Sequence, residues 1–343
     1  MTFCFFVLFC FVLFVCRDQP VHLYDAYTGA IRTTYCPYNS LDEMESPSVV
    51  SFGRNGQTIL MGGFRTDRML HVFDVNRPGR ESMSVWRLGK TRRSKDGQKG
   101  LVSALASCTW PNNLIAVGTY APGSIYLYDD RVPSTEVASM VITGTCVVGH
   151  GKAHARKSKH FLSRDTDGDD LTFSAAKVRW FQSRSRGGVT SLKWDEEHFH
   201  YLYSVSRRSN AVLAWDVRRL SSMSHVCPGV ASYETSNETN QRLDFAIHES
   251  RLWVGGMDAK IRVYQLSSRE LIGQMDDSLK DTVNGVSLSN SNGKTLLAVS
   301  LGSRKFPSDD DWDNDLPAIS ALMGTDDSGL QLYDVQWRLP NSG

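Results

Sequence analysis

The stretch PVHLYDAYTG (20–29) decides the fold: it is a short apolar strand that ends in an aromatic residue followed by an acid, and a turn comes next. Related blocks recur along the chain as MLHVFDVNRPG (69–79), SIYLYDDR (124–131), AVLAWDVRR (211–219), KIRVYQLSSRE (260–270) and GLQLYDVQW (329–337). Their aromatic residues are spaced 49, 55, 87, 49 and 69 residues apart. Repeats of this kind, with a Trp-Asp-like ending, are typical of WD-repeat β-propeller blades of about 40 to 45 residues.

A matching pair of strands precedes most copies of the block, for example in SVVSFGRNGQTILMGGFR (48–65) and GVTSLKWDEEHFHYLYSVSR (188–207). Each pair is an alternating apolar strand, a polar turn and a second apolar strand, as in the meander of one blade. A β-sandwich with short strands is the alternative, but a sandwich has no reason to repeat one block. The sequence therefore predicts an all-β WD-repeat β-propeller.

The aromatic and acidic residues at the strand ends are expected to be structural, closing each blade and capping a turn. They are Tyr24, Asp25, Phe73, Asp74, Tyr128, Asp129, Trp215, Asp216, Tyr264, Tyr333 and Asp334.

The propeller is expected to occupy residues 17–337, followed by a tail at 338–343. The excess over one blade length predicts a disordered insertion at about 143–186, a second insertion after Arg304 and a Ser-rich third one from Leu220 to Thr239. The first block has almost no blade before it, so we expect five complete blades and a fragment. Such a ring has open sheet edges.

Residues 1–16 form an unbroken apolar run after the initiator methionine. The run is shorter than the roughly 20 residues of a membrane-spanning helix, and it lacks the basic region and the small-residue cleavage site of a signal peptide. Three interpretations stay open: an artefactual start of the chain, a genuine membrane anchor or secretory segment, and a partial propeller strand.

Composition excludes several classes of function. Lys and Arg number 38 against 37 Asp and Glu, so any nucleic-acid site must be a local patch. The seven cysteines include no C-x-x-C pair, and we expect no metal and no cofactor. The acidic stretch 165–169 lacks the glycine and glutamate positions of a calcium loop. No hydrolase, P-loop or metalloprotease motif occurs, which predicts that the protein is not an enzyme and has no small-molecule substrate.

Several segments go beyond a generic WD repeat: CRDQPVHLYDAYTGAIR followed by YNSLDE (16–43), FDVNRPGRE (73–81), TNQRLDF (239–245), NGVSL (284–288) and SRKFP (303–307). In their order and spacing they resemble the telomerase Cajal body protein family. The resemblance covers about 90% of the chain, residues 17–337. It implies a seven-bladed propeller that binds the CAB box of small Cajal body RNAs and, in animals, of telomerase RNA.

The chain departs from this family in two places. The resemblance implies that the first blade and most of the second are missing, and the apolar run stands in their place. The insertion 143–186 also separates Gly149-His150 from Gly187-Gly188-Val189-Thr190, which are contiguous in relatives. Any RNA binding that depends on the segment divided by the insertion, or on the missing blades, does not follow from the resemblance.

The turn between the second and third strands of each blade opens onto one face of a propeller, near its central channel. Arg17, Arg65 and Arg207 lie in this turn, seven or eight residues before the aromatic residue of their blades. Tyr120 and Met257 hold the corresponding positions in two others, Arg304 follows the same strand in the last blade, and Arg242 is expected on the same face. Arginines beside an aromatic side chain can bind phosphates and stack on an unpaired base. The RNA-binding candidates are these residues without Met257: Arg17, Arg65, Tyr120, Arg207, Arg242 and Arg304.

Basic residues 156–159 could add nonspecific attraction to phosphates, or form a solvated loop or a nuclear localisation signal. The leading hypothesis is a nuclear, Cajal body-like, monomeric scaffold that binds small nuclear RNA of the box H/ACA type and ribonucleoprotein proteins, with telomerase RNA as one candidate. The alternatives are a WD scaffold that binds only proteins, and a membrane-anchored propeller if residues 1–16 are a genuine anchor.

Overall fold

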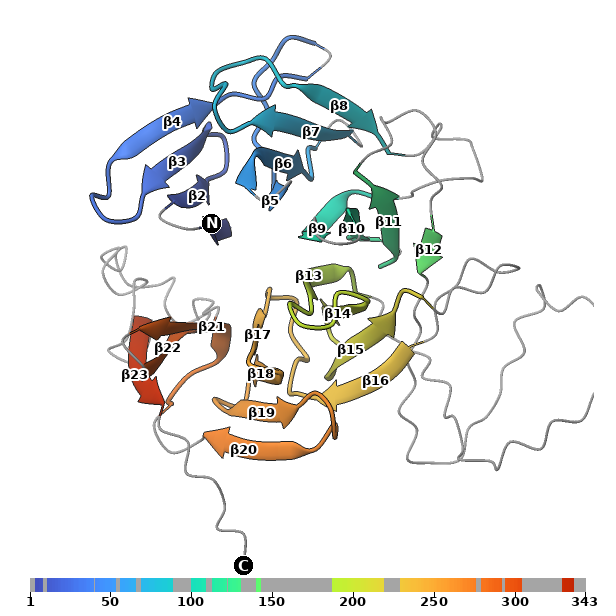
Figure 1. Ribbon diagram of the computed structural model, residues 1–343, viewed down its shortest axis with the longest axis vertical. Coiled ribbons are helices and arrows are strands. Elements are labelled where there is room, and N and C mark those ends of the chain that lie inside the picture. The colour runs from blue at the N-terminus through green and yellow to red at the C-terminus, as the bar shows by residue number, and fades with distance from the viewer. Residues whose placement is uncertain are drawn as a thin grey trace, which may run out of the picture.

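The computed structural model describes residues 4–8, 11–39, 41–53, 56–65, 69–88, 100–108, 113–121, 123–130, 140–142, 187–218, 229–275, 279–291, 294–303 and 329–335. Within these ranges the regular structure consists of β-strands, without an α-helix. The strands form six antiparallel sheets that follow one another around a ring (Figure 1). The WD-repeat β-propeller predicted from the repeats is confirmed.

Each sheet is one blade. The first blade contains β1 (Cys4–Leu8), β2 (Phe11–Val15), β3 (Val21–Asp25) and β4 (Ile31–Tyr35); the second contains β5 (Val49–Gly53), β6 (Thr58–Gly62), β7 (Met69–Asp74) and β8 (Ser84–Arg87). The third contains β9 (Val102–Cys108), β10 (Leu114–Thr119), β11 (Ile125–Asp129) and β12 (Met140–Ile142); the fourth contains β13 (Val189–Trp194), β14 (Tyr201–Ser206), β15 (Ala211–Asp216) and β16 (Gly229–Glu234). The fifth contains β17 (Phe245–His248), β18 (Arg251–Gly255), β19 (Ile261–Gln265) and β20 (Leu271–Met275), and the sixth β21 (Val283–Ser291), β22 (Lys294–Leu301) and β23 (Gly329–Val335).

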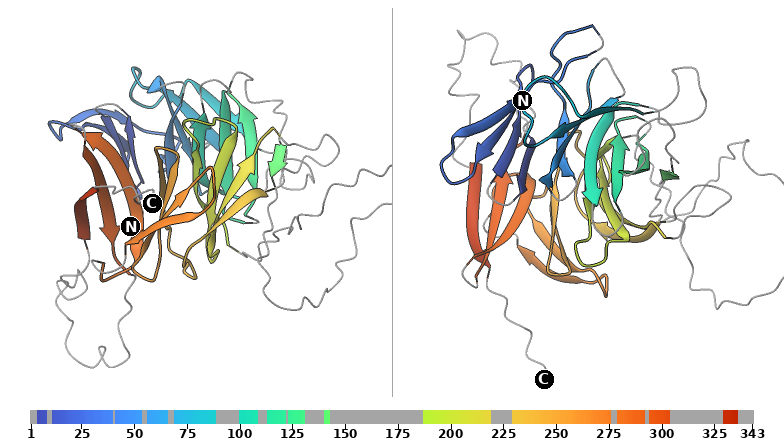
Figure 2. Two further views of the ribbon diagram at one scale, coloured as in Figure 1. Left: turned by 60° about the horizontal axis from the view of Figure 1, so that its bottom comes forward. Right: turned by 45° about the horizontal axis from the view of Figure 1, so that its top comes forward.

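Strand order within each blade follows the sequence, and the first strand lies nearest the centre of the ring (Figure 1). The strands run between the two faces of the ring (Figure 2). Because neighbours are antiparallel, all turns between second and third strands open onto one face, which we call the upper face. The turns between first and second strands, and between third and fourth strands, open onto the lower face.

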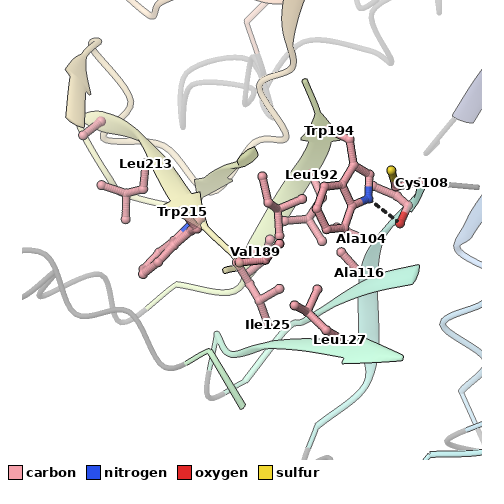
Figure 3. Close-up of a cluster of buried hydrophobic side chains, with 14 residues drawn as sticks. Ala104, Cys108, Ala116, Ile125, Leu127, Val189, Leu192, Trp194, Leu213 and Trp215 are labelled. Carbon is pink, nitrogen blue, oxygen red and sulfur yellow. Dashed lines mark hydrogen bonds between the residues drawn. The ribbon is translucent and has the colours of Figure 1, made fainter. Parts of the chain in front are cut away.

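The core lies between the blades. Five clusters of buried apolar side chains each join two successive blades. Figure 3 shows the cluster between the third and fourth blades, where Trp194 packs beside Leu192 and Ala104 and its indole Nε1 donates a hydrogen bond to the carbonyl oxygen of Ala106 at 3.1 Å. Burial of both faces explains why strands such as β6 (TILMG) and β15 (AVLAWD) are apolar almost throughout.

The first blade differs from the expected fragment, because the apolar run supplies two of its four strands. β1 pairs with β2, and β2 pairs with β3. Leu13 and Val15 of β2 are buried in the cluster shared with the second blade. The sequence analysis had kept a partial propeller strand among its three interpretations of this run. It missed the hairpin because the two residues between the strands, Phe9 and Cys10, are not of the Gly, Pro, Asn, Asp or Ser types that mark turns.

A second difference concerns the Ser-rich segment from Leu220 to Thr239. The expectation of an insertion over this whole range is wrong, because β16 lies within it and pairs with β15 to complete the fourth blade. Its sequence GVASYE is too short and too polar to stand out as a strand. The expected insertions at 143–186 and after Arg304, and the acidic stretch 165–169, lie outside the described residues.

We predict that Gly255→Ala destabilises the joint between the fifth and sixth blades. A Cβ at this position would lie 2.3 Å from Cγ1 of Val283 and 2.8 Å from its carbonyl oxygen. Overpacking of this kind costs about 1–3 kcal/mol, so the melting temperature measured by circular dichroism should fall by several degrees. Gly29→Asn is the matched control, since Gly29 has a φ of +67° and open space around it. An unchanged melting temperature for Gly255→Ala would contradict this account of the joint.

The outer edge of β23 has no partner strand among the described residues. An unpaired edge is a template for pairing with another chain. We therefore expect the chain, expressed alone, to self-associate with rising concentration, as measured by size-exclusion chromatography with light scattering. A monodisperse monomer that melts in a single cooperative transition would be evidence against this expectation.

Candidate functional site

The upper face carries the candidate residues in equivalent positions. Arg17, Arg65, Tyr120, Arg207 and Met257 each follow the second strand of their blade by one to three residues. Arg304 lies outside the described residues. The spacing rule derived from the repeats therefore locates the same turn in five blades, because each blade repeats the same meander.

Arg207 and Tyr120 are in direct contact across the joint between the third and fourth blades. The guanidinium carbon of Arg207 lies 4.5 Å from the centroid of the Tyr120 ring. Its Nη1 donates a hydrogen bond to the Tyr120 hydroxyl at 2.9 Å. Tyr120 is 50% exposed, so part of the ring remains accessible. A cation over an aromatic face contributes about 0.5–1 kcal/mol at an exposed site. The pair is thus held together and open to a ligand.

Two glycines allow this contact. The backbone N–H of Arg207 donates to the carbonyl oxygen of Gly188 at 2.9 Å. A Cβ on Gly188 would lie 2.2 Å from the carbonyl oxygen of Tyr120, and one on Gly187 would lie 2.2 Å from that of Arg207. A larger residue at position 188 would push the third and fourth blades apart, whereas one at position 187 would push the start of β13 away from the end of β14 within the fourth blade. The sequence analysis noted Gly187 and Gly188 only as part of a family segment that the insertion separates from Gly149-His150. Nothing in the sequence indicated their role in packing.

Two further basic residues belong to nearby segments of the fourth blade and of the entry to the fifth. Arg208 is exposed, and its backbone N–H donates to the carbonyl oxygen of Thr239 at 3.2 Å. Arg242 lies half-buried in the segment that leads into β17. Sequence reasoning had not selected Arg208, because it follows Arg207 directly and no other blade repeats it.

Near the centre of the ring, Arg242 adjoins a half-buried polar group around Asp244. The Asp244 carboxylate accepts a hydrogen bond from Ser191 Oγ at 2.6 Å and lies 3.5 Å from Lys193 Nζ. Burial would raise the pKa of Asp244, but the positive charges of Lys193 and Arg242 and the hydrogen bond from Ser191 outweigh it and hold the pKa below its usual value. Asp244 therefore stays ionised and offsets part of the positive charge.

Arg17 and Arg65 belong to the first and second blades, on another part of the ring from Arg207 (Figure 1). The guanidinium Nε of Arg17 lies 3.3 Å from Asp18, and both side chains are largely exposed. The backbone N–H of Arg65 donates to the carboxylate of Glu45. Exposed pairs of this kind contribute about 0–1 kcal/mol. The structure thus joins Arg207 to Tyr120 and leaves Arg17 and Arg65 apart from them.

The strand-end residues lie at the opposite side of each blade. Oδ1 of Asp25 accepts hydrogen bonds from the backbone N–H groups of Tyr27 and Thr28 at 2.9 and 3.0 Å. Asp74 and Asp216 accept equivalent backbone hydrogen bonds in their own turns. These acids cap lower-face turns, as Asx-turn residues do. The side chain of Asp334 is outside the described part of the chain.

Segments that depart from a generic WD repeat meet at the joints between blades. Arg80 stacks over the ring of Tyr38 at 4.1 Å and pairs with Asp42. Gly79 forms backbone hydrogen bonds with Thr34 and Cys36 at 3.0 and 2.8 Å. The segments 73–81 and 38–43 therefore fasten the second blade to the first. The sequence analysis had identified both segments as departures from a generic WD repeat, but it did not predict that they contact each other.

The segments 239–245 and 284–288 meet in the same way. The backbone N–H of Asp244 donates to the carbonyl oxygen of Asn284 at 2.8 Å, which joins the fifth blade to the sixth. Among the described residues, no group of three His, Cys, Asp or Glu side chains could hold a metal ion. In the same part of the chain, no helix is long and apolar enough to cross a membrane.

Comparison with known structures supports the fold. A chain in the crystal structure of the mitotic checkpoint complex superposes with a TM-score of 0.53 at 14% identity, covering 85% of this chain and 73% of that one. At this identity the similarity concerns the fold alone. No protein-family model matches the chain.

Curated relatives extend over most of the sequence. Telomerase Cajal body protein 1 of Mesocricetus auratus is 28% identical over 92% of this chain and 50% of its own length. The protein of the same name from Homo sapiens is 26% identical over 92% of this chain and 49% of its own. The homologue from Drosophila melanogaster is 22% identical over 87% and 44%, respectively. The chain thus spans about half the length of these relatives. The resemblance noted in the motifs is confirmed, and the chain is a WD-repeat β-propeller homologous to the telomerase Cajal body proteins.

Proposed function

We propose that the protein is a non-catalytic scaffold that binds an unpaired segment of small nuclear RNA on its upper face. The contact between Arg207 and Tyr120 carries this proposal, because it combines a half-exposed aromatic ring with a guanidinium group. Unpaired bases stack on aromatic side chains, and guanidinium groups bind phosphates through paired N–H donors.

Two features of Arg207 suit this role. Its Nη1 is bonded to the Tyr120 hydroxyl, and its Nε is buried without a hydrogen-bond partner among the described residues. The Nη2 donors are therefore the ones that a phosphate oxygen would approach. The side chain is also already stacked, so little rotamer freedom is lost when RNA binds.

Other basic residues would act around this pair. Arg208 and Arg242 are the nearest additions, since they belong to the same blade and to the segment that enters the next. Arg17 and Arg65 belong to other blades, and Arg304 follows β22 in the sequence; we propose that all three contribute weaker contacts along a longer RNA. A near-neutral protein binds RNA through such a local patch rather than through its overall charge.

The relatives suggest the class of RNA. They are named Telomerase Cajal body protein 1, and the family that the motifs resemble binds small Cajal body RNAs of the box H/ACA type. We propose the same RNA class for this chain, with telomerase RNA as one candidate, and a nuclear role in ribonucleoprotein assembly with protein partners of those particles.

We predict that two substitutions separate charge from stacking. Arg207→Gln should lower the salt dependence of RNA binding by about one unit in the slope of log K against log salt. Tyr120→Ala should weaken binding by about 1–3 kcal/mol through lost stacking, whereas Tyr120→Phe should retain most of the affinity. Fluorescence anisotropy with a single-stranded RNA over a salt series measures both effects.

Arg269→Gln is the matched control, because Arg269 is exposed in a lower-face turn of the fifth blade. It should leave both affinity and slope unchanged. Equal losses in Arg207→Gln and Arg269→Gln would mean nonspecific attraction. Unchanged binding in all Arg207 and Tyr120 variants would move the RNA site elsewhere.

The RNA class is tested in cells. Crosslinking and sequencing of RNA bound to the tagged protein, expressed from its native transcript, should enrich small box H/ACA RNAs, and Arg207→Gln should reduce that enrichment. Recovery of no RNA above background would favour a scaffold that binds only proteins.

A further inference from the structure

The lower face has a cavity of about 390 Å³ at the joint between the third and fourth blades, on the opposite side of the ring from Tyr120 and Arg207. Its lining consists of Leu114 from the third blade and Glu197, His198, Phe199, His200, Val217 and Arg218 from the fourth. None of these residues takes part in the proposed RNA site.

The floor of the cavity is apolar. Leu114 and Phe199 are half-buried and pack against the core cluster of the joint, and Val217 belongs to that cluster. These three side chains leave room for one bulky apolar group from a ligand. Burial of such a group removes apolar surface from water and so favours binding.

The loop that presents the histidines is fixed by hydrogen bonds. Asp195 is buried, and its Oδ1 accepts from the backbone N–H groups of Glu197 and His198 at 2.9 and 3.0 Å. The backbone N–H of Val217 donates to the carbonyl oxygen of His200 at 3.0 Å, which ties the two lower-face turns together. A preformed loop lowers the entropy cost of binding.

Hydrogen-bond donors dominate the polar rim. Nε and Nη2 of Arg218 hold both oxygens of Asp216 at 3.1 and 3.0 Å, and the Arg218 side chain is 62% exposed. Three of its five N–H donors remain outside this pair. The Glu197 carboxylate accepts from the Ser250 hydroxyl. Arg218, held in place by Asp216 and flanked by His198 and His200, therefore keeps N–H donors for an acidic group, most readily when His200 is protonated and offsets the negative charges of Asp195, Asp216 and Glu197.

We propose that this cavity docks a short segment of a partner protein in which a bulky apolar side chain is followed by an acidic one. The apolar side chain would occupy the space over Leu114, Phe199 and Val217, and the carboxylate would bind Arg218. A propeller that uses its two faces in this way can hold an RNA and a protein at once, as a scaffold requires.

The charge of His200 links this docking to pH. Burial lowers the pKa of His200, Arg218 and His198 lower it further, and Asp216 and Asp195 act in the opposite direction. A bound carboxylate would favour the protonated imidazole and raise its pKa. Affinity for the acidic segment should therefore rise as the pH falls from about 7.5 to about 5.5, across the usual titration range of histidine.

The test uses a displayed peptide library and the full chain. Each peptide of the first library has one position varied among Leu, Ile, Phe and Trp, followed by two positions that are Asp or Glu. A matched second library has Lys or Arg at those two positions. We expect enrichment of acidic members only. Affinity measured by fluorescence polarisation with an enriched peptide should fall about tenfold or more in Arg218→Gln, the loss of about 1.4 kcal/mol or more that a charge-assisted bond contributes.

Arg77→Gln is the control, since Arg77 is exposed in a lower-face turn of the second blade. It should bind like the unmodified chain. His200→Gln should bind at pH 7.5 and lose the rise at low pH. Melting curves establish that each variant is folded, and RNA affinity should be unchanged in Arg218→Gln, which separates this proposal from the RNA site. The proposal would be overturned if the basic library were enriched or if neither library were enriched. It would also be overturned if Arg218→Gln and Arg77→Gln bound the peptide equally.

Discussion

The close approach of β13 to β9 and β10 at the joint between the third and fourth blades supports both faces on which we propose binding sites. Gly118 and Gly188 make it possible, because a Cβ on Gly118 would lie 2.8 Å from Val189 and one on Gly188 would lie 2.2 Å from the carbonyl oxygen of Tyr120. The hydrogen bond from Trp194 to Ala106 then fixes how the blades lie against each other (Figure 3). A core packed to this density transmits any displacement to its edges.

That joint ends differently on the two faces of the ring. On the upper face it brings Arg207 of the fourth blade onto the ring of Tyr120 in the third. On the lower face it leaves Leu114 and Phe199 as the floor of a cavity with Arg218 at its rim. The first arrangement suits stacked bases and phosphates, and the second suits an apolar side chain with a carboxylate. A scaffold gains from this separation because two partners need not compete for one surface.

The segments that mark the family serve mainly to join blades. Arg80, Tyr38 and Asp42 connect the second blade to the first, and Asp244 with Asn284 connects the fifth to the sixth. Apolar side chains alone tolerate many packings, whereas hydrogen bonds and ion pairs are directional and need defined partners. These residues therefore specify which blade lies next to which, and family resemblance in them reports on architecture at least as much as on RNA binding.

The sequence alone determined the propeller class, the position of the upper-face turn in each blade and the family resemblance, because each depends on residues a few positions apart in a repeated meander. It did not determine that residues 4–15 complete the first blade, since no turn-type residue interrupts the apolar run. Nor did it determine that 229–234 is a strand, since that short and polar segment lies within a Ser-rich stretch. Only the tertiary structure paired Arg207 with Tyr120, selected Arg208 and formed the cavity beside Arg218. Those contacts join residues about ninety or more positions apart, and the packing between blades that creates them leaves no local pattern in the sequence.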